Sequence, residues 1–331
     1  MTIATVSDVG ERALIERIIA RLAIPSWVVV GPGDDAAVVE PERGALDVLT
    51  TDVQVEGVHF DTRFVPPEAI GHRALAVNLS DLAAMGARPR AALLSLILPD
   101  DLDVTVVDRL LEGVLTVAEA HGVAGIGGTI ARSPGPLVVD VTVTGTAKRR
   151  RVLTRGTARP GDAVYVTGAV GDALVGLESL RGGGSAGLAT QERRYLHPEP
   201  RVRAGVLLAR NRAASACIDL SDGLADGVRQ IAEASRAGMT IDGDALPIAP
   251  AVRRWHEDRG RDPVPAVLRG GDDYELLFTV RPAHRGRLRA ITRMLGDLPM
   301  TCIGTMTKQQ TVAIRTERGE YPLPEGFEHF R

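Results

Sequence analysis

Residues 74–87 read Ala-Leu-Ala-Val-Asn-Leu-Ser-Asp-Leu-Ala-Ala-Met-Gly-Ala, an apolar stretch with one carboxylate near its centre. The spacing of apolar residues over 67–85 predicts a long helix. Asp is unfavourable inside a helix, so Asp81 does not serve helix formation, and Asn78 lies three residues earlier on the same face. A carboxylate held in such a place needs a partner. This stretch therefore predicts a helix that carries a functional acid.

Hydrophobic periodicity on either side of this helix predicts two domains that both mix helices and strands. The strands expected at 36–39 and 46–50 should pair with each other. The crossing between domains is expected at 148–160, where three arginines precede Arg-Pro-Gly-Asp. We therefore expect an α+β protein with domains at 1–150 and 151–331. Further helices are expected at 8–23, 104–121, 171–180, 199–210, 224–237 and 284–295, and further strands at 27–30, 91–98, 138–144, 163–167, 215–220, 275–280 and 300–315.

The composition disfavours several classes of function. The 331 residues carry a formal net charge of −3 and only 3% aromatics, which disfavours nucleic-acid binding. Only Lys148 and Lys308 are lysines, and neither has the surroundings of a P-loop or a protein-kinase lysine. The two cysteines, Cys217 and Cys302, are isolated, which excludes a thiolate zinc site. No signal-peptide core or apolar run of about 18 residues is present, so we expect a cytoplasmic protein that does not enter a membrane.

Short aspartate motifs recur along the chain, each beside a strand end or a glycine turn. Any one of them could merely cap a helix or close a turn. If several carboxylates converge, they repel each other unless cations lie among them. No two histidines have metal-ligand spacing, and oxygen ligands suit Mg²⁺, which usually arrives with substrate phosphates. The motifs are Gly33-Asp34-Asp35, Thr50-Thr51-Asp52, Asn78-Leu79-Ser80-Asp81, Asp219-Leu220-Ser221-Asp222-Gly223 and Gly270-Gly271-Asp272-Asp273.

Two glycine-rich segments lie beside these acids. Gly127-Gly128-Thr129 and Gly168-Ala169-Val170-Gly171 are interpreted as turns whose backbone N–H groups could bind phosphate oxygens. Together with the acids, they favour a magnesium-dependent enzyme that acts on phosphates.

Taken in order, these motifs resemble the thiamine-monophosphate kinase family. That family belongs to an ATP-binding superfamily with aminoimidazole ribonucleotide synthetase, selenophosphate synthetase and a hydrogenase maturation protein. The resemblance spans nearly the whole chain and implies the aminoimidazole ribonucleotide synthetase-like fold, with an N-terminal sheet flanked by helices and a C-terminal α/β domain. The matching segments are Gly33-Asp34-Asp35-Ala36-Ala37, Thr50-Thr51-Asp52, Gly57-Val58-His59-Phe60, residues 74–87, Leu153-Thr154-Arg155, residues 218–223, residues 270–276 and Cys302-Ile303-Gly304.

The resemblance also implies roles for single residues and for the two domains. The N-terminal domain would bind ATP and Mg²⁺ and form a homodimer, and the C-terminal domain would complete the active site. The implied ligands of several Mg²⁺ ions are Asp35, Thr50, Thr51, Asp52, Asp81, Thr129, Asp219 and Asp222. The implied ATP contacts are Gly128, Thr129, Arg155 and Ser221, and the implied thiamine phosphate contacts are His59, Asp272 and Phe327.

Three positions depart from the family's pattern. Thr129 stands where the family has a metal-binding aspartate, and a hydroxyl is a poorer ligand than a carboxylate. We expect one Mg²⁺ position to be weakened, with a slower or more metal-demanding enzyme. Asp272 stands where Glu is common, and Phe327 where Tyr or Trp occurs, which leaves the substrate affinity open.

The implied reaction is ATP plus thiamine phosphate giving ADP plus thiamine diphosphate. A phosphate monoester is mostly deprotonated at pH 7, so the chain needs no general base, and none is evident in its motifs. Two alternatives stay open at this point. One is a nucleotide-binding regulatory protein that has lost catalysis, which the Thr129 departure suggests. The other is a related phosphotransferase that acts on another small anionic substrate.

Overall fold

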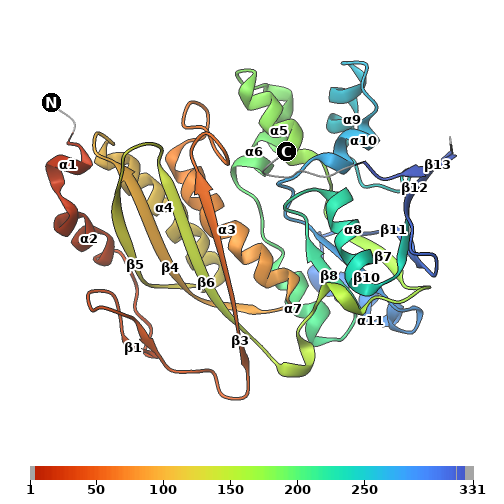
Figure 1. Ribbon diagram of the computed structural model, residues 1–331, viewed down its shortest axis with the longest axis horizontal. Coiled ribbons are helices and arrows are strands. Elements are labelled where there is room, and N and C mark those ends of the chain that lie inside the picture. The colour runs from red at the N-terminus through yellow and green to blue at the C-terminus, as the bar shows by residue number, and fades with distance from the viewer. Residues whose placement is uncertain (1–3, 318, 325–331) are drawn as a thin grey trace. The chain divides into compact units, whose positions relative to one another are not determined.

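The computed structural model describes residues 4–317 and 319–324 and divides into two compact units (Figure 1). The N-terminal unit comprises the chain up to Leu82 together with Arg88–Lys148, and the C-terminal unit comprises Ala83–Ala87 and the chain from Arg149 onwards. Both units mix helices and strands, so the predicted α+β class is confirmed. None of the described helices is long and apolar enough to cross a membrane.

The N-terminal unit is built on a four-stranded sheet in the order β3-β6-β4-β5, with β4 and β5 parallel and the other pairs antiparallel. A separate two-stranded ribbon joins β1 and β2. The elements are α1 (Val6–Val9), α2 (Glu11–Ile19), β1 (Val28–Val30), β2 (Val38–Val39), β3 (Leu46–Val55), α3 (Pro67–Ala84), β4 (Arg88–Pro99), α4 (Val104–His121), β5 (Ala124–Ser133) and β6 (Val138–Ala147).

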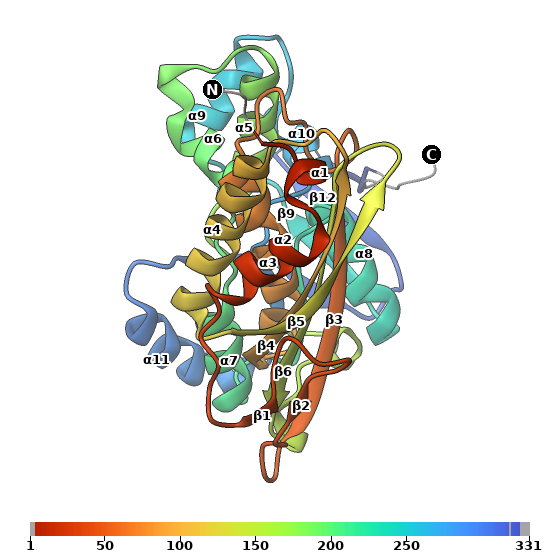
Figure 2. The same cartoon turned by 90° about the vertical axis from the view of Figure 1, so that its left-hand side faces the viewer.

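Among the described residues, the helices α3 and α4 lie against one face of the four-stranded sheet. Figure 2 shows α3 and α4 on one side of the strands. Along β3, exposed and less exposed residues alternate, and along β6 the valines at 139, 141 and 143 are buried between half-exposed Asp140, Thr142 and Thr144. Because side chains alternate across a strand, the two faces differ in chemistry. We call them the covered face, which meets α3 and α4, and the open face.

The C-terminal unit contains a seven-stranded sheet in the order β13-β12-β9-β11-β7-β10-β8. Buried aliphatic side chains from this sheet and from α5, α8 and α10 form its core. The elements are η1 (Arg149–Arg151), η2 (Arg155–Thr157), β7 (Ala163–Thr167), α5 (Asp172–Arg181), η3 (Ala186–Leu188), α6 (Ala189–Leu196), α7 (Val202–Arg210), β8 (Ala216–Asp219), α8 (Leu224–Ser235), β9 (Gly238–Asp242), α9 (Pro250–Glu257), α10 (Pro263–Arg269), β10 (Leu276–Val280), η4 (Pro282–His284), α11 (Arg285–Leu295), β11 (Met300–Thr307), β12 (Val312–Thr316) and β13 (Gly319–Pro322).

Several expectations about single elements were wrong. The helix expected at 8–23 breaks at Gly10, whose φ of +78° lies in the left-handed region, and it ends at Ile19. The strand β2 pairs with β1, whereas β3 pairs with β6, so the expected pairing of 36–39 with 46–50 does not form. Glycine content hid the strand β5, because Gly-rich sequence is more typical of turns. The elements α6, β9, α9 and α10 were also not expected.

The packing of α3 on α4 depends on two glycines. A Cβ added at Gly71 would lie 1.9 Å from the Leu110 carbonyl oxygen, and one at Gly113 would lie 1.9 Å from the Glu68 carbonyl oxygen. Both contacts are with backbone, which cannot turn away. The helix layer on the covered face therefore depends on the close approach of α3 and α4.

We predict that Gly71→Ala lowers the free energy of unfolding by about 1–3 kcal/mol, because the added methyl forces the two helices apart. Urea denaturation measures this change. The matched control is Gly286→Ala in α11, where an added Cβ meets no atom within 4 Å and helix propensity favours Ala. Equal stability of Gly71→Ala and wild type would contradict the packing argument.

Candidate active site

On the covered face, β3 and α3 bring three of the predicted metal ligands together. Thr50 and Asp52 are alternate residues of β3 and point to the same side. The Thr50 hydroxyl donates a hydrogen bond to the Asp81 carboxylate on α3. Asp81 thus has the partner that its position in an apolar helix required. Asn78 does not supply it, because the Asn78 amide donates to the Ala74 carbonyl at 3.0 Å.

The open face holds Thr51, which the pleat of β3 separates from Thr50 and Asp52. Its hydroxyl oxygen lies 3.0 Å from Asp140 Oδ1 and 3.0 Å from the Thr142 hydroxyl oxygen, both on β6. The side chains of Thr50, Thr51 and Asp52 therefore do not form one cluster on β3. None of the sequence motifs contains Asp140, although its place in the alternating strand at 138–144 could have indicated it.

A cavity of about 610 Å³ in the N-terminal unit gathers further predicted residues. Its lining includes Asp35, Gly128 and Thr129, together with Ser95 and Thr142. Asp35 is exposed and follows Asp34, whose carboxylate accepts the Asp35 backbone N–H at 2.9 Å. The predicted nucleotide segment and one predicted metal ligand thus share a cavity.

Gly127-Gly128-Thr129 is part of β5 rather than a phosphate-binding turn. In the sheet, Gly128 pairs with Leu94 and Thr129 pairs with Ser95 on β4. A Cβ at Gly128 would lie 1.8 Å from the Leu94 carbonyl oxygen, so only glycine fits there. These glycines let two backbones approach closely.

His59 lies in the turn that follows β3. Its Nδ1 accepts the Val55 backbone N–H at 3.1 Å, which fixes the ring against the end of the strand. The Phe60 carbonyl accepts the Gly57 N–H at 2.8 Å and closes the same turn. The structure therefore gives His59 a defined orientation in the N-terminal unit, and its substrate role stays a prediction.

In the C-terminal unit, two of the aspartate motifs are joined by backbone hydrogen bonds. The Asp272 N–H donates to the Ser221 carbonyl at 2.7 Å, and the Tyr274 N–H donates to the Leu220 carbonyl at 2.9 Å. Asp272 and Tyr274 both have positive φ, +66° and +49°, and the Tyr274 hydroxyl donates to Asp272 Oδ1 at 3.0 Å. Non-glycine residues in this region are strained and concentrate at functional sites. These hydrogen bonds join the two loops into one structure.

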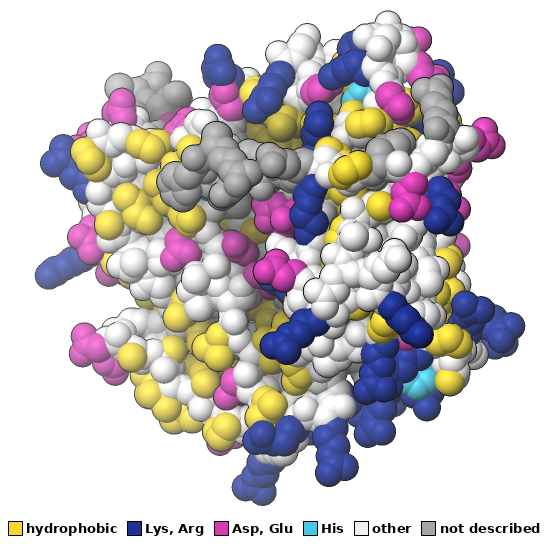
Figure 3. All heavy atoms as spheres, turned by 45° about the vertical axis from the view of Figure 1, so that its right-hand side comes forward, with side chains coloured by type: hydrophobic (Ala, Val, Ile, Leu, Met, Phe, Trp, Pro, Cys, Tyr) yellow, Lys and Arg dark blue, Asp and Glu magenta, His cyan; other side chains and the backbone are white. Residues whose placement is uncertain are grey.

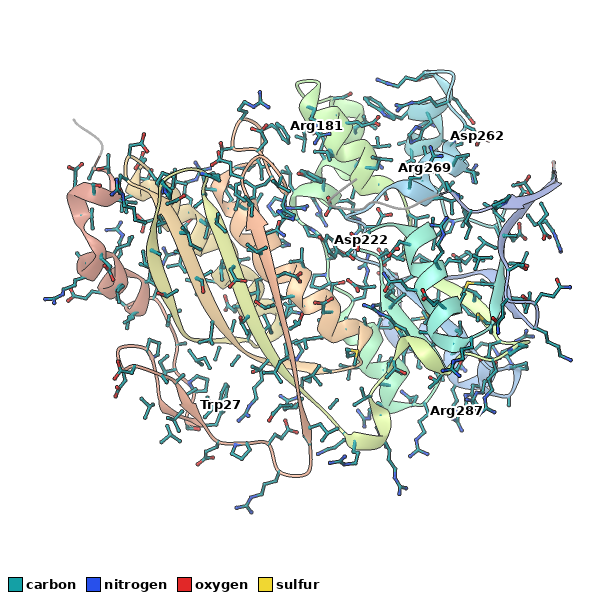
Figure 4. The ribbon with its side chains drawn as sticks, viewed as in Figure 1. Trp27, Arg181, Asp222, Asp262, Arg269 and Arg287 are labelled. Atoms are coloured by element: carbon teal, nitrogen blue, oxygen red, sulfur yellow. The ribbon has the colours of Figure 1, made fainter. Side chains whose placement is uncertain are left out.

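This joined structure carries Ser221 and Asp222 immediately before α8, and Figure 4 labels Asp222 there. The Ser221 hydroxyl donates to Asp222 Oδ2 at 3.2 Å. Asp219 lies at the end of β8 and is only 6% exposed. The acids of 219–223 are thus held at the end of β8, the edge strand of the sheet, and in the loop that follows it.

Asp273, in the middle of the Gly270–Glu275 loop, caps α5. Its carboxylate accepts the Gly171 N–H at 2.7 Å and the Ala173 N–H at 3.4 Å. Burial raises the pKa of Asp273 well above its ordinary value, and the carboxylates of Asp172 and Glu275 add to this, although the two N–H donors oppose it.

The structure does not favour the phosphate-binding turn expected at 168–171. The Gly171 N–H is used by Asp273, and the Gly168 and Val170 N–H groups donate to the carbonyls of Pro299 and Pro247. Three donors of this segment therefore bind protein acceptors. The sequence did not indicate this, because the acceptors lie far away along the chain.

Glu275 and Arg201 form a buried ion pair behind the same loop. Their side chains are 4% and 10% exposed, and the Arg201 Nε donates to Glu275 Oε2 at 2.7 Å. Glu275 also accepts the Thr167 hydroxyl at 2.5 Å, and that hydroxyl accepts the Leu276 N–H at 2.8 Å. The pair fixes the end of the loop to β7 and β10.

Arg155 and Phe327 are the remaining predicted residues of the site. Arg155, in η2, donates from Nη1 to the Gln230 side-chain oxygen of α8 at 2.5 Å. Phe327 lies outside the described residues.

The donor atoms of the candidate site suit a hard cation. Within residues 4–317 and 319–324, no three His, Cys, Asp or Glu side chains are grouped as a metal site. The N-terminal unit instead pairs carboxylates with hydroxyls, at Asp81 with Thr50 and at Asp140 with Thr51. Mg²⁺ is commonly held by one or two carboxylates plus substrate phosphates. The residues therefore fit Mg²⁺ in the company of a phosphorylated ligand.

Comparison with known proteins places this site in a family. Models of the AIR synthase related protein match the chain, the N-terminal domain at residues 33–147 and the C-terminal domain at 159–317. A thiamine-monophosphate kinase of Synechococcus elongatus is 36% identical over 100% of this chain and 99% of its own length. One of Salmonella typhimurium is 38% identical over 97% and 98%. The chain belongs to the thiamine-monophosphate kinase family.

Solved structures agree with this family. The thiamine-monophosphate kinase of Stenotrophomonas maltophilia K279a superposes with a TM-score of 0.82 at 38% identity, covering 91% of this chain and 95% of its own. A structure described as AaThiL complexed with AMPPCP and TMP has a TM-score of 0.78 at 32% identity and covers 100% of both chains. The predicted aminoimidazole ribonucleotide synthetase-like fold is thus confirmed.

We predict that Glu275→Gln lowers the free energy of unfolding by about 3 kcal/mol, because it removes the buried one of the two carboxylates that pair with the Arg201 guanidinium, the other being the more exposed Glu199. Urea unfolding measures the loss. The control is Glu320→Gln, which breaks the exposed Arg315–Glu320 pair and should cost at most about 1 kcal/mol. Equal losses in the two variants would show that the buried pair does not fix the loop.

Proposed function

We propose that this chain transfers the γ-phosphoryl group of ATP to thiamine phosphate, giving ADP and thiamine diphosphate. The observation that carries the proposal is the likeness, over the whole length, to thiamine-monophosphate kinases that are 36% and 38% identical. The ligands named for the AaThiL structure, AMPPCP and TMP, support ATP as the donor and thiamine monophosphate as the acceptor.

The acceptor's chemistry agrees with the residues of the site. The second pKa of a phosphate monoester is about 6, so the attacking oxygen already carries charge at pH 7. No side chain therefore has to remove a proton, and we assign no general base. The chain's task is to hold two anions in line and to offset their repulsion.

The carboxylates are proposed to serve this task by holding Mg²⁺. When bound, Mg²⁺ would supply positive charge that offsets the repulsion between the two anionic substrates. Asp81 and Asp52 face one side of β3, while Asp219 ends β8 and Asp222 lies in the loop before α8. The proposed Mg²⁺ ligands are Asp35, Thr50, Thr51, Asp52, Asp81, Thr129, Asp219 and Asp222.

The remaining roles complete the proposal. Gly128, Thr129, Arg155 and Ser221 are proposed to contact ATP. His59 and Asp272 are proposed to contact thiamine phosphate, together with Phe327. We assign nucleotide and metal binding and dimerisation to residues 1–150, and completion of the active site to 151–331. A cytoplasmic location, where thiols stay reduced, is part of the proposal, since both cysteines are free.

A homodimer is also proposed, on the strength of the open face. Leu49, Val53 and Leu93 on this face are 68%, 44% and 37% exposed. Figure 3 shows hydrophobic side chains at the surface, in patches among charged ones. Large exposed apolar side chains on one face are typical of protein–protein contacts. A second copy of this chain offers the same face, on which these apolar residues lie among Thr51, Asp140 and Thr142, so the surface can pair with itself.

The two alternatives are separated from the proposal by a coupled assay for ADP release, run with and without Mg²⁺ over a panel of small phosphates and carboxylates. The proposal requires Mg²⁺-dependent ADP release with thiamine phosphate. Nucleotide binding without ADP release would favour a regulatory protein. Release with another acceptor in preference to thiamine phosphate would favour a related phosphotransferase.

We predict that Asp52→Asn and Asp222→Asn each lower turnover by at least about 10²-fold, because each removes a charge that holds the metal. Their urea midpoints should stay close to that of wild type. Asp101→Asn, at an exposed position outside the site, is the control and should keep full activity. A folded Asp52→Asn variant with wild-type turnover would remove Asp52 from the site.

We predict that Leu49→Arg converts a dimer into a monomer, because two copies would each place a charge in the apolar interface. Light scattering coupled to size-exclusion chromatography gives the mass. Met294→Arg, at a 53% exposed position of α11, is the control and should leave the mass unchanged. A Leu49→Arg variant that stays dimeric would exclude the open face as the interface.

A further inference from the structure

Three segments of the C-terminal unit carry an excess of positive charge. Residues 149–161, 200–218 and 276–296 together contain 14 arginines and no Asp, Glu or Lys. The whole chain, by contrast, has 42 Asp and Glu against 39 Lys and Arg. The net charge of −3 therefore conceals these segments, because the acids lie elsewhere along the chain. All three segments belong to the same compact unit.

Hydrogen bonds bring the three segments together in space. Arg151 in η1 donates from Nη1 to the carbonyl oxygen of Arg210, which ends α7. Arg287 on α11 donates to the Arg212 carbonyl oxygen at 3.0 Å. Arg203 on α7 donates to a backbone carbonyl near the end of α11 at 2.8 Å. Helices α7 and α11 therefore lie side by side, with η1 at the end of α7.

The exposed arginines of η1, α7, the turn after α7, and α11 form a surface that we call the arginine face. Residues four positions apart lie on the same side of a helix, so α11 alone presents three of them one turn apart. Figure 3 shows Lys and Arg side chains gathered at the lower right of the view, and Figure 4 labels Arg287 on α11. The members are Arg149, Arg150, Arg203, Arg210, Arg212, Arg285, Arg287, Arg289 and Arg293.

The acids of the protein do not balance the arginine face. Within residues 4–317 and 319–324, none of its nine arginines forms an ion pair. Elsewhere in the same unit, Arg193, Arg261 and Arg315 each pair with a glutamate. The charges of the arginine face are therefore left to solvent and small counterions, which a larger anionic ligand can replace.

His284, which directly precedes α11, reports this positive charge. Burial lowers the pKa of His284, and the charges of Arg287 and Arg281 lower it further. Asp162 opposes this effect, but its side chain is buried and accepts the Ser215 hydroxyl at 2.6 Å. The acid nearest to this part of the surface is thus already used inside the protein.

The apolar content of the face distinguishes between classes of anionic partner. Protein–protein interfaces have an apolar core, and membrane surfaces bind helices that insert apolar side chains. Among the described residues of the three segments, Met294 is the one large apolar side chain that is mostly exposed, at 53%. Nucleic-acid interfaces are more polar and more positively charged than protein interfaces, and their affinity comes mainly from phosphate contacts. The face therefore favours a nucleic acid.

The residue types favour the phosphate backbone of a duplex. Arginine binds phosphate through two parallel N–H donors, which lysine cannot do. Arg203 and Arg287 are already held by backbone carbonyls, and each guanidinium keeps further N–H donors for a ligand. Phe278 is the one aromatic residue of the three segments and is buried, so the face offers no platform for stacking single-stranded bases.

We infer that the arginine face binds the phosphate backbone of double-stranded nucleic acid without sequence preference. The inference goes beyond the proposed kinase function and does not depend on it. The net charge of the whole chain argues against such a ligand only because it averages over acids that lie outside this face.

The test is the fluorescence anisotropy of a labelled DNA duplex of about 20 base pairs, titrated with the full chain. We expect a micromolar dissociation constant at about 50 mM salt, and an affinity roughly 10²-fold weaker at about 200 mM, because phosphate contacts release counterions. A second duplex of the same length and unrelated sequence should bind within about twofold, since backbone contacts carry no sequence information.

Two sets of variants, matched in charge, locate the binding. The first set removes three charges of the arginine face and should weaken binding about tenfold or more at about 50 mM salt. It should also reduce the slope of log affinity against log salt by about 2–3. The second set removes three exposed arginines of α5, α9 and α10 and should bind within about twofold of wild type. The sets are Arg150→Gln, Arg210→Gln and Arg289→Gln, and Arg181→Gln, Arg254→Gln and Arg269→Gln.

The same three positions changed to lysine separate charge from structure. Arg150→Lys, Arg210→Lys and Arg289→Lys together keep the charge, so the salt slope should stay close to that of wild type. Circular dichroism melting confirms that each set is folded. If the first glutamine set does not fold, Arg150→Gln with Arg289→Gln replaces it and should reduce the slope by about 2.

Four results would overturn the inference. The first is a wild-type chain that does not bind the duplex at about 50 mM salt. The second is an equal loss of affinity in the two glutamine sets, and the third is a lysine set that loses the salt slope. The fourth is tighter binding to phosphatidylglycerol vesicles or to polyglutamate than to the duplex, which would assign the face to a membrane or to an acidic protein.

Discussion

The alternation of side chains along β3 is the constraint on which the candidate site depends. Because α3 and α4 cover one face of the four-stranded sheet, each polar residue of β3 is assigned to one of two environments. Thr50 and Asp52 meet the Asp81 helix, whereas Thr51 meets Asp140 and Thr142 on the open face. The three consecutive polar residues Thr50, Thr51 and Asp52 thus lie on both faces of one sheet.

The C-terminal unit uses a different device to hold its acids. Backbone hydrogen bonds join the loops at 219–223 and 270–275, and Asp273 ties them to α5. Glu275 and Arg201 then fix the loop end from behind. The half-buried Asp222 and Asp272 are therefore supported by Asp273 and Glu275, which is how a site gains precision from its supporting residues. Substitutions in the supporting set should alter stability and positioning before they alter any direct substrate contact.

Much of the fold and part of the candidate site could be predicted from the sequence. The predictions that were wrong or missing have physical causes. The α+β class and the long helix carrying Asp81 followed from periodicity, since local spacing determines both. The partner of Asp81 could not be predicted in this way, because Thr50 lies 31 residues away and the packing of a strand against a helix is a long-range property. Glycines 127 and 128 suggested a turn, whereas they permit a close strand approach. Asp140 escaped notice because no motif contains it, and only pairing with β3 and β4 gives it neighbours.

The central claim is that this chain moves a phosphoryl group between two anions that it holds with magnesium. Phosphorus-31 NMR of the full chain with ATP, thiamine phosphate and Mg²⁺ tests this claim most directly, because it follows both reactants and products. The account predicts that the paired phosphorus signals of thiamine diphosphate grow as fast as the ATP γ-signal is lost. Loss of that signal to inorganic phosphate alone, or no change in the presence of Mg²⁺, would contradict it.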